Sequence, residues 1–312
     1  MIQNTLRSSR TYLNKGQKTA IVNNKRASAV MAIFVLWLVN TGVSATELAE
    51  ATAVAKVKQI IAHRGASAER PECTLAAIRR AIEVGATAVE VDVRTSKDGQ
   101  LFILHDTKLD RTTNAKGPAN ALTLAQLQPL DAGSWFDVRY RGERIPSLVE
   151  AAEVCRGKID LLLDLKEQGE TYDHKVVRVI CEHGDSTRTI VGVRSVPQAK
   201  RFRKLLPAAK QLALIPTVDD IEAFADAGVD CIRLWPRWLS ENNEPVKRIR
   251  AVNKQLHLNG SMGGLDETRA LLVHEPDSLS SDHPRKLKET LRKIANGQRP
   301  QEGSTPEKNC GR

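Results

Sequence analysis

Two histidines and two carboxylates, all set in apolar segments, are the residues of this sequence most suited to chemistry. His63 follows the apolar run QIIA, and His105 follows LFIL. Between them, Glu90 and Asp92 interrupt the apolar run VEVDV at a spacing of two. Because side chains alternate along a strand, both carboxylates point to one face. Two buried carboxylates are costly unless a positive charge compensates them, and a divalent cation would do so.

The elements that position these residues alternate between short apolar segments and helical patterns, which favours parallel strands joined by helices. We predict strands near 58–63, 87–93, 159–165, 188–193, 210–215, 229–234, 255–260 and 277–281. Helices are predicted near 75–82, 147–156, 172–183, 197–206, 219–227, 243–253, 265–272 and 284–295. Eight such units predict an α/β fold of the TIM (β/α)8 barrel type, which suits a domain of about 235 residues.

The segment that carries His105 does not fit as a ninth barrel strand. LFILH follows VEVDVRT through the tight turn Ser96–Gly99, and so short a connection makes an antiparallel hairpin. Residues from about 95 to 146 are therefore predicted to form an insertion between strand 2 and helix 2. Insertions at the C-terminal side of a barrel build active sites.

A third carboxylate is predicted at the same end of the barrel. In the segment IDLLLDLK, Asp164 and Lys166 share one face with Asp160 and Leu162. The other face carries Leu161, Leu163 and Leu165. These three leucines should meet the helices. Asp164 and Lys166 should then lie inside the C-terminal mouth, as Glu90 and Asp92 do.

Between Ile61 and Gly117 the sequence carries HRG, PE-T, E-D on a strand, DG, HD and RTT in this order. The order and spacing resemble the glycerophosphodiester phosphodiesterase family. The resemblance continues more weakly to about residue 284, and includes an I-P-S/T-L pattern that ends the insertion. SSDHP near the end resembles the family's T-D-x-P, so Asp282 would support the site from the eighth strand.

The sequence departs from the family pattern at three places. The family's usual Asn after Pro-Glu is Cys73 here, and its Glu-x-Lys is Asp164-Leu165-Lys166. The seventh strand carries HLNGSMGG where relatives often have an aromatic W-T-x-N segment. Trp235 and Trp238, after the sixth strand, would either replace that aromatic wall or simply cap the barrel.

The resemblance implies metal-dependent hydrolysis of glycerophosphodiesters to glycerol 3-phosphate and an alcohol. It assigns the proton transfers to His63 and His105, and leaves open which is the acid and which the base. Arg64 would hold the phosphate, and Lys166 would add a point charge. In this family the substrate's own glycerol hydroxyl attacks first, which gives a cyclic phosphate that water opens.

The metal ligands that the resemblance implies are Glu90, Asp92 and Asp164, holding one divalent cation. Their hard oxygen atoms suit Mg²⁺ or Ca²⁺ rather than zinc. Because Asp is one methylene shorter than the family's Glu, ligation by Asp164 could be shifted or mediated by water. Asp164 and Lys166 could also simply pair with each other.

Three further polar residues have structural as well as functional interpretations. Glu72, from the PE-T segment, either supports the site or only begins a helix, where acidic residues are favoured. Asp106 and Arg111 are expected to shape the hairpin and the insertion rather than to touch the substrate.

The first 45 residues contain six Lys or Arg and no acidic residue, followed by an apolar stretch and the small residues Val43-Ser44-Ala45. This layout predicts an export signal at 1–45, and hence a periplasmic or secreted protein. The apolar stretch is short for a bilayer, so no stable membrane span is expected, although cleavage and anchoring both stay open. The phosphodiesterase domain is predicted at 57–295, with a disordered polar tail at 296–312.

Charge and cysteines exclude some classes of function. The net charge of +10 falls to +4 beyond residue 45, and aromatic residues are only 4% of the chain, which does not suggest a nucleic-acid partner. The cysteines show no metal-type pairing and are interpreted as structural, although one disulfide could form. They are Cys73, Cys155, Cys181, Cys231 and Cys310.

The expected partner is a small glycerophosphodiester, with the oligomeric state left open. Two alternatives stay beside this hypothesis. The same barrel could act on another phosphodiester, such as a lysophospholipid, or it could be a catalytically impaired binding protein. The presence of both histidines and of the E-x-D pair counts against the binding protein, because a silent barrel has no need of buried polar groups.

Overall fold

The computed structural model describes residues 44–239 and 243–297. The predicted export signal and tail therefore lie outside the described residues, apart from two residues of each. The chain divides into two units, Met1–Leu48 and Ala49–Arg312. In the described part of the first unit, Ser44 and Glu47 exchange backbone-to-side-chain hydrogen bonds at the start of helix α2 (Ala45–Lys56). Within the described residues, no helix combines the length and the apolar character that crossing a membrane requires.

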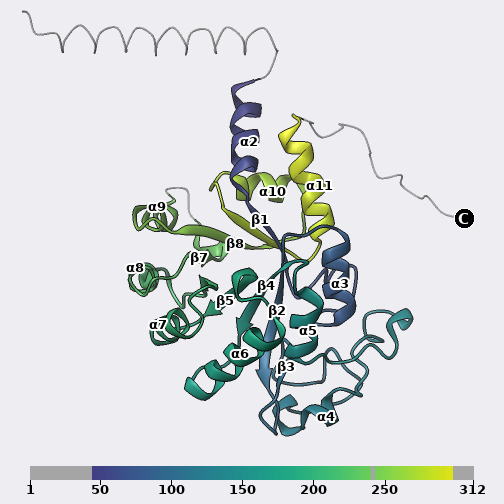
Figure 1. Ribbon diagram of the computed structural model, residues 1–312. Coiled ribbons are helices and arrows are strands. Elements are labelled where there is room, and N and C mark those ends of the chain that lie inside the picture. Colours follow the sequence, from purple (N-terminus) through teal and green to yellow (C-terminus); the bar gives the residue numbers. More distant parts are fainter. Residues whose placement is uncertain (1–43, 240–242, 298–312) are drawn as a thin grey trace, which may run out of the picture. The chain divides into compact units, whose positions relative to one another are not determined.

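Eight parallel strands of the second unit close into a barrel (Figure 1). Their order is β1-β9-β8-β7-β6-β5-β4-β2, and pairing between β2 and β1 completes the circle. The strands are β1 (Gln59–Ala62), β2 (Ala88–Thr95), β4 (Asp160–Leu165), β5 (Thr189–Val193), β6 (Lys210–Ala213), β7 (Cys231–Leu234), β8 (Gln255–Ser261) and β9 (Ser278–Ser281). The predicted TIM barrel is confirmed, with strand ends within two residues of those expected.

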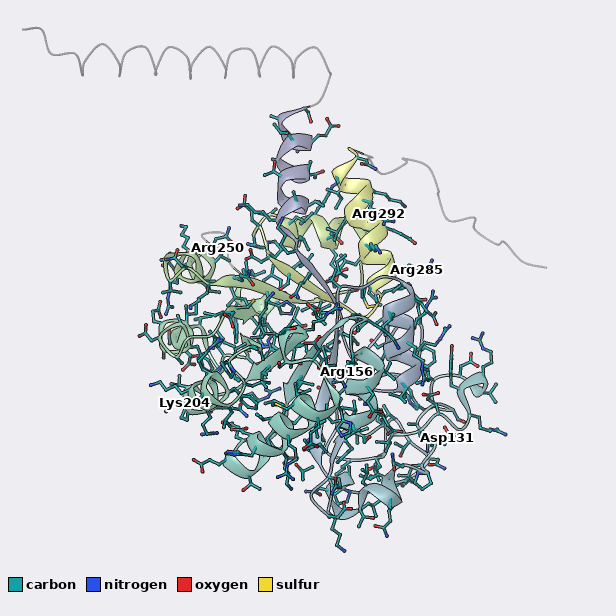
Figure 2. All side chains as sticks on the ribbon, viewed as in Figure 1. Asp131, Arg156, Lys204, Arg250, Arg285 and Arg292 are labelled. Carbon is teal, nitrogen blue, oxygen red and sulfur yellow. The ribbon has the colours of Figure 1, made fainter. Side chains whose placement is uncertain are left out.

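Helices surround the barrel, as predicted, and three of them begin at a residue whose side chain caps the helix. The side chains of Thr74, Ser147 and Ser195 each accept a hydrogen bond from a backbone N–H three residues on. Figure 2 shows charged side chains such as Arg285 and Arg292 on helix α11. The helices are α3 (Leu75–Glu83), α5 (Leu148–Cys155), α6 (Glu170–His183), α7 (Val196–Leu205), α8 (Ile221–Asp226), α9 (Glu244–Ala251), α10 (Leu265–Leu272) and α11 (Pro284–Ala295).

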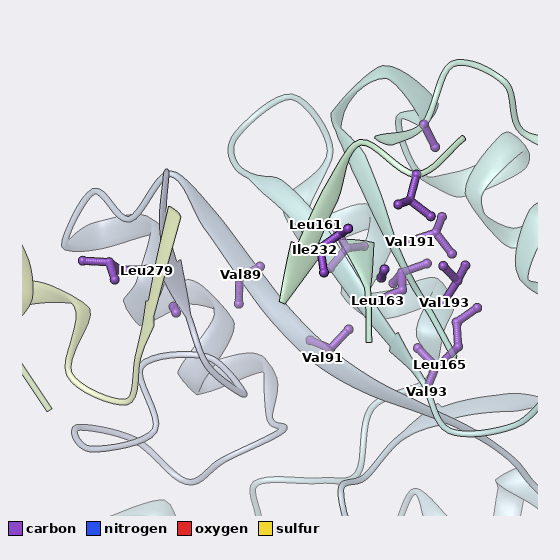
Figure 3. Packing of buried hydrophobic residues seen from close by; sticks show 14 of the residues in the cluster. Val89, Val91, Val93, Leu161, Leu163, Leu165, Val191, Val193, Ile232 and Leu279 are labelled. Carbon is purple, nitrogen blue, oxygen red and sulfur yellow. The ribbon is translucent and has the colours of Figure 1, made fainter. Parts of the chain in front are cut away.

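Alternation along the strands separates two sets of apolar side chains. One set is buried between strands and helices, at ~1.5–3 kcal/mol of stabilisation for each fully buried side chain; it includes Val89, Val91, Val93, Leu161, Leu163 and Leu165 (Figure 3). The other set fills the barrel interior and comprises Ile61, Ala88, Leu162, Ile190, Leu212 and Leu214. The prediction that the odd-numbered leucines of β4 meet the helices is confirmed.

The insertion between β2 and α5 has a hydrophobic core of its own. β3 (Leu101–Ile103) pairs antiparallel with β2, which confirms the predicted hairpin. The rest of the insertion holds the 3-10 turns η1 (Ala119–Ala121) and η2 (Val138–Tyr140) and the short helix α4 (Leu124–Leu127). The buried residues of the insertion's core are Phe102, Leu104, Leu109, Ala119, Leu127, Ala132 and Ile145. This core holds in place the loop that follows β3 and carries His105.

We predict that Phe102→Ala destabilises the protein by about 3–5 kcal/mol, because the Phe102 side chain is fully buried in the core of the insertion. Urea unfolding followed by circular dichroism measures the change. Val138→Ala is the control, since Val138 belongs to the same insertion but is 66% exposed, and it should change stability by no more than about 0.5 kcal/mol. Equal effects of the two substitutions would show that the insertion has no packed core.

Candidate active site

A single cavity of about 210 Å³ at the C-terminal mouth of the barrel brings all the predicted site residues together. These are His63, Arg64, Glu90, Asp92, His105, Asp164 and Lys166. His63 and Arg64 directly follow β1, Lys166 directly follows β4, and the hairpin of the insertion supplies His105. Residues that lie more than a hundred positions apart in sequence therefore line one space.

Three carboxylates are crowded together on one side of this cavity. β2 and β4 are neighbours in register, so Asp92 lies beside Asp164. Oxygens of Glu90, Asp92 and Asp164 lie within 4.8 Å of one another. Glu90 is 5% exposed, and burial together with the charge of Asp92 raises its pKa to about 8. A cation between these groups would favour the ionised form of Glu90 and so oppose that shift.

Positive partners of the β2 carboxylates come from other segments of the chain. Sequence reasoning found none for them on their own strand, but Lys166 Nζ lies 2.6 Å from Asp92 Oδ1. Arg64 Nε lies 3.6 Å from the other oxygen of Asp92, and the Arg64 backbone N–H donates to Glu90 at 2.7 Å. Strand pairing and the loop after β1 therefore bring cationic groups to these acids from outside their own strand.

Asp164 is engaged at both oxygens. Lys166 Nζ donates to Oδ2 at 2.7 Å, so the pair considered from the sequence does form. Arg194, at the end of β5, donates to Oδ1. Burial acts to raise the pKa of Asp164, but the two cations outweigh burial and lower it. Sequence reasoning missed Arg194, although VGVR ends its strand with a basic residue much as LLLDLK does.

His63 is oriented by an acid from the last strand. Its Nδ1 donates to Asp282 Oδ1 at 2.7 Å, and Ser67 Oγ donates to the same oxygen at 3.0 Å. Asp282 thus supports the site as the resemblance implied. Burial acts to lower the pKa of His63, but the Asp282 hydrogen bond and the charge of Glu90 raise it above the usual value. Because Nδ1 is engaged, Nε2 is the nitrogen left for the cavity.

His105 is held in a similar way by its neighbour in the chain. Its Nδ1 donates to Asp106 Oδ1 at 2.7 Å, and Arg111 Nε donates to the second oxygen of Asp106 at 2.7 Å. Arg111 also binds Glu72 through two hydrogen bonds of 2.7 and 2.8 Å, and Arg64 donates to Glu72 at 3.0 Å. Arg111 holds the pKa of Asp106 down at about 2. The expected shaping role of Asp106 and Arg111 thus extends to orienting His105.

Cys73 is a core residue that lies against the acidic cluster. Its backbone has φ = +57°, a left-handed conformation that Asn adopts more readily than most residues. Its Sγ lies 3.3 Å from Asp92 Oδ2, and burial raises the pKa of the thiol. The described cysteines, Cys73, Cys155, Cys181 and Cys231, are all free. Cys73 is buried in the core, as the structural interpretation predicts, and its thiol also contacts Asp92.

The opposite wall of the cavity comes from β7, β8 and β9. Trp235 lines the cavity, as the alternative of a replacement aromatic wall predicts. Trp238 instead packs against the core, as the alternative of a barrel cap predicts. Arg233, His257 and Asn259 also line this wall and were missed. The pattern CIRLW could have indicated Arg233, because it shares a face with Cys231, which lies at the barrel interior.

Fold and cavity define a TIM-barrel protein with an acidic cluster and two carboxylate-bound histidines at its C-terminal mouth. Residues 63–284 match the sequence model of the Glycerophosphoryl diester phosphodiesterase family. This match covers more than half of the chain, which therefore belongs to that family.

Individual proteins agree with this assignment. The chain is 30% identical to the glycerophosphodiester phosphodiesterase of Bacillus subtilis, over 74% of this chain and 87% of that protein. It is 37% identical to the enzyme of that name from Caldanaerobacter subterraneus, over 48% of this chain and 64% of that protein. The chain spans less than two thirds of the length of two relatives. It covers 64% of the Caldanaerobacter subterraneus enzyme and 62% of a putative glycerophosphodiester phosphodiesterase of Bacillus subtilis, YhdW.

A solved structure shares the fold. The phosphodiesterase of Oleispira antarctica, in complex with the product sn-glycerol-3-phosphate, is 26% identical to this chain. It superimposes with a TM-score of 0.68 over 77% of this chain and 99% of its own.

We predict that His257→Gln reduces the acid sensitivity of the fold. His257 is 2% exposed, and burial with the charge of Arg233 lowers its pKa to about 3. The unfolded chain takes up a proton near pH 6.5 but the folded chain only near pH 3, so stability falls as pH drops between these values, by up to ~1.4 kcal/mol per pH unit. Urea unfolding at pH 6.5 and 5.5 should show a smaller loss in the variant. His174→Gln, at an exposed helical position, should behave like the wild type; an unchanged loss in His257→Gln would contradict the assignment.

Proposed function

We propose that this chain hydrolyses glycerophosphodiesters to glycerol 3-phosphate and an alcohol. One observation carries the proposal: two histidines, each bound to a carboxylate through Nδ1, line the same cavity as three crowded carboxylates, two of which are buried. Family membership supports this reaction, and so does the Oleispira antarctica structure, whose bound product is sn-glycerol-3-phosphate. The paired histidines count against a catalytically impaired binding protein.

The acidic cluster fits one divalent cation, Mg²⁺ or Ca²⁺. Glu90, Asp92 and Asp164 would hold it, because they offer hard oxygen atoms within 4.8 Å of one another, and because the pKa of Glu90 stays raised despite the cations that pair with Asp92 and Asp164. Such an ion, when bound, neutralises phosphate oxygens and makes a nearby hydroxyl more acidic. The lowered pKa of Asp164 keeps this carboxylate ionised at neutral pH, as a ligand must be.

The two histidines would move the protons. Asp282 and the surrounding charges favour the protonated form of His63, so we assign His63 as the acid that protonates the leaving alkoxide. His105, fixed by Asp106 at the end of the insertion, would be the base that removes a proton from the attacking oxygen. In both cases the carboxylate at Nδ1 selects the tautomer and the ring orientation.

Arg64 and Lys166 would bind the phosphate. Arg64 Nε is buried and has no hydrogen-bond partner among the described residues, and Lys166 Nζ lies between Asp92 and Asp164. Their positions place positive charge beside the acidic cluster, where a phosphodiester would meet it. Export of the protein, to the periplasm or beyond, stays part of the proposal on the basis of the first 45 residues of the sequence.

The reaction is tested by release of glycerol 3-phosphate from glycerophosphoethanolamine and glycerophosphocholine. Turnover should stop with EDTA and return with Mg²⁺ or Ca²⁺. His63→Ala and His105→Ala should each lose about 10²–10⁴-fold in kcat, because each removes one proton transfer. His183→Ala is the control, since His183 also binds a carboxylate through Nδ1 but lies on α6, outside the cavity lining. No turnover by folded wild-type protein with either metal would refute the proposal.

Ligation by Asp164 is tested by metal binding rather than by activity. Asp164→Asn should weaken Mg²⁺ or Ca²⁺ binding by about 10-fold or more in calorimetry, because a charged ligand is lost. Asp164→Glu, which supplies the longer side chain typical of the family, should bind at least as tightly as the wild type. Asp160→Asn is the control at the far end of the same strand, where Asp160 pairs with Arg188. Equal affinities in wild type and Asp164→Asn would remove Asp164 from the ligand set.

A further inference from the structure

The wall opposite the acidic cluster carries a buried arginine to which the proposed mechanism gives no role. Arg233 lies on β7, which is four strands away from β2 in either direction around the closed barrel. The residue is only 9% exposed, and its side chain lines the cavity. Arg233 therefore faces Glu90 and Asp92 across the space that a substrate would occupy.

Arg233 lacks a close counter-ion within residues 44–239 and 243–297. Its Nε is buried and finds no hydrogen-bond partner in the part of the chain that the structure describes, and its guanidinium stacks on the Trp235 ring at 4.2 Å from the ring centre. Burial lowers its pKa to about 10, which still leaves the group cationic at neutral pH. A buried cation without a partner is costly, and an anionic ligand would offset that cost.

The side chains that line the cavity also carry more positive than negative formal charge. Three carboxylates are opposed by four cationic side chains, which are Arg64, Lys166, Arg194 and Arg233. With a divalent ion in the acidic cluster the formal charge becomes +3, whereas a phosphodiester carries one negative charge. The site therefore has capacity for a second anionic group.

Trp235 gives no support to a cationic alcohol group. An aromatic ring can bind an ammonium group through its face. Here the guanidinium groups of Arg233 and Arg237 already lie over the ring, at 4.2 and 5.1 Å from its centre. The stacking instead orients Arg233 and adds positive charge to this wall.

We propose that Arg233 binds a second anionic group on the alcohol part of the substrate, so that the site prefers glycerophosphodiesters whose alcohol carries a carboxylate or a phosphate. This inference rests on the proposed function and specifies its substrate class. A guanidinium can donate two parallel hydrogen bonds to either group. Arg233 thus determines specificity and takes no part in the proton transfers.

Matched pairs of substrates test this preference. Glycerophosphoserine differs from glycerophosphoethanolamine by one carboxylate, and glycerophosphoinositol 4-phosphate differs from glycerophosphoinositol by one phosphate. The wild type should show a kcat/KM higher by about 10-fold or more for the anionic member of at least one pair, and the pair concerned identifies the group. In Arg233→Gln that ratio should fall towards one.

Two further variants complete the test. Arg237→Gln removes a neighbouring charge that stacks on the same ring but lies outside the cavity lining, and it should retain the preference. Arg233→Lys keeps the charge without the planar fork, so its ratio should lie between those of wild type and Arg233→Gln. If Arg233→Gln does not fold, the comparison of Arg233→Lys with the wild type still tests the role of Arg233.

The possible failures are distinct. The role of Arg233 is overturned if the wild type cleaves the two members of each pair with equal kcat/KM. It is also overturned if the preference is the same in wild type, Arg233→Gln and Arg233→Lys. Either result leaves the proposed function intact. A folded wild-type protein that cleaves none of the four substrates overturns the proposed function, and this inference with it.

Discussion

Burial of three carboxylates at one end of the barrel is the constraint on which the rest of the site depends. Desolvation of these acids must be compensated, and Lys166 does so for both Asp92 and Asp164, while Arg194 engages the second oxygen of Asp164. The backbone N–H of Arg64 contributes at Glu90. The cations that stabilise the acids are also those that an anionic substrate requires, so the stability of this region and its chemistry rest on the same side chains.

The barrel was predictable because its signals are local. A period of two in VEVDV and LLLDL places acids and aliphatic residues on opposite faces, and the turn at Ser96–Gly99 excludes a parallel ninth strand. The site residues were predicted from the same local patterns, together with the order of motifs that resembles the glycerophosphodiester phosphodiesterase family. Arg194 and Arg233 were missed although their strands carry a weak local signal, because the partner of a single arginine in or after a strand is known only when the neighbouring strands are known.

The insertion shows why a loop can carry a residue that must be placed accurately. Loops are commonly mobile, but here Phe102 and its neighbours form a packed core beneath the hairpin. Arg111 then connects Asp106 to Glu72, so the segment around His105 is tied to the loop before α3. Rigidity comes from packing within the insertion, and alignment with the barrel comes from charged hydrogen bonds.

The contact between His63 and Asp282 joins the two ends of the barrel domain, since one residue follows the first strand and the other follows the last. During synthesis, the ribosome completes all seven predicted site residues more than a hundred positions before it reaches Asp282. A nascent or truncated chain that ends before β9 would contain these residues, yet it would lack both the strand that seats His63 and the carboxylate that orients it. His63 is therefore oriented for proton transfer only after the last strand has been translated and has closed the barrel, although His63 lies near the start of the domain.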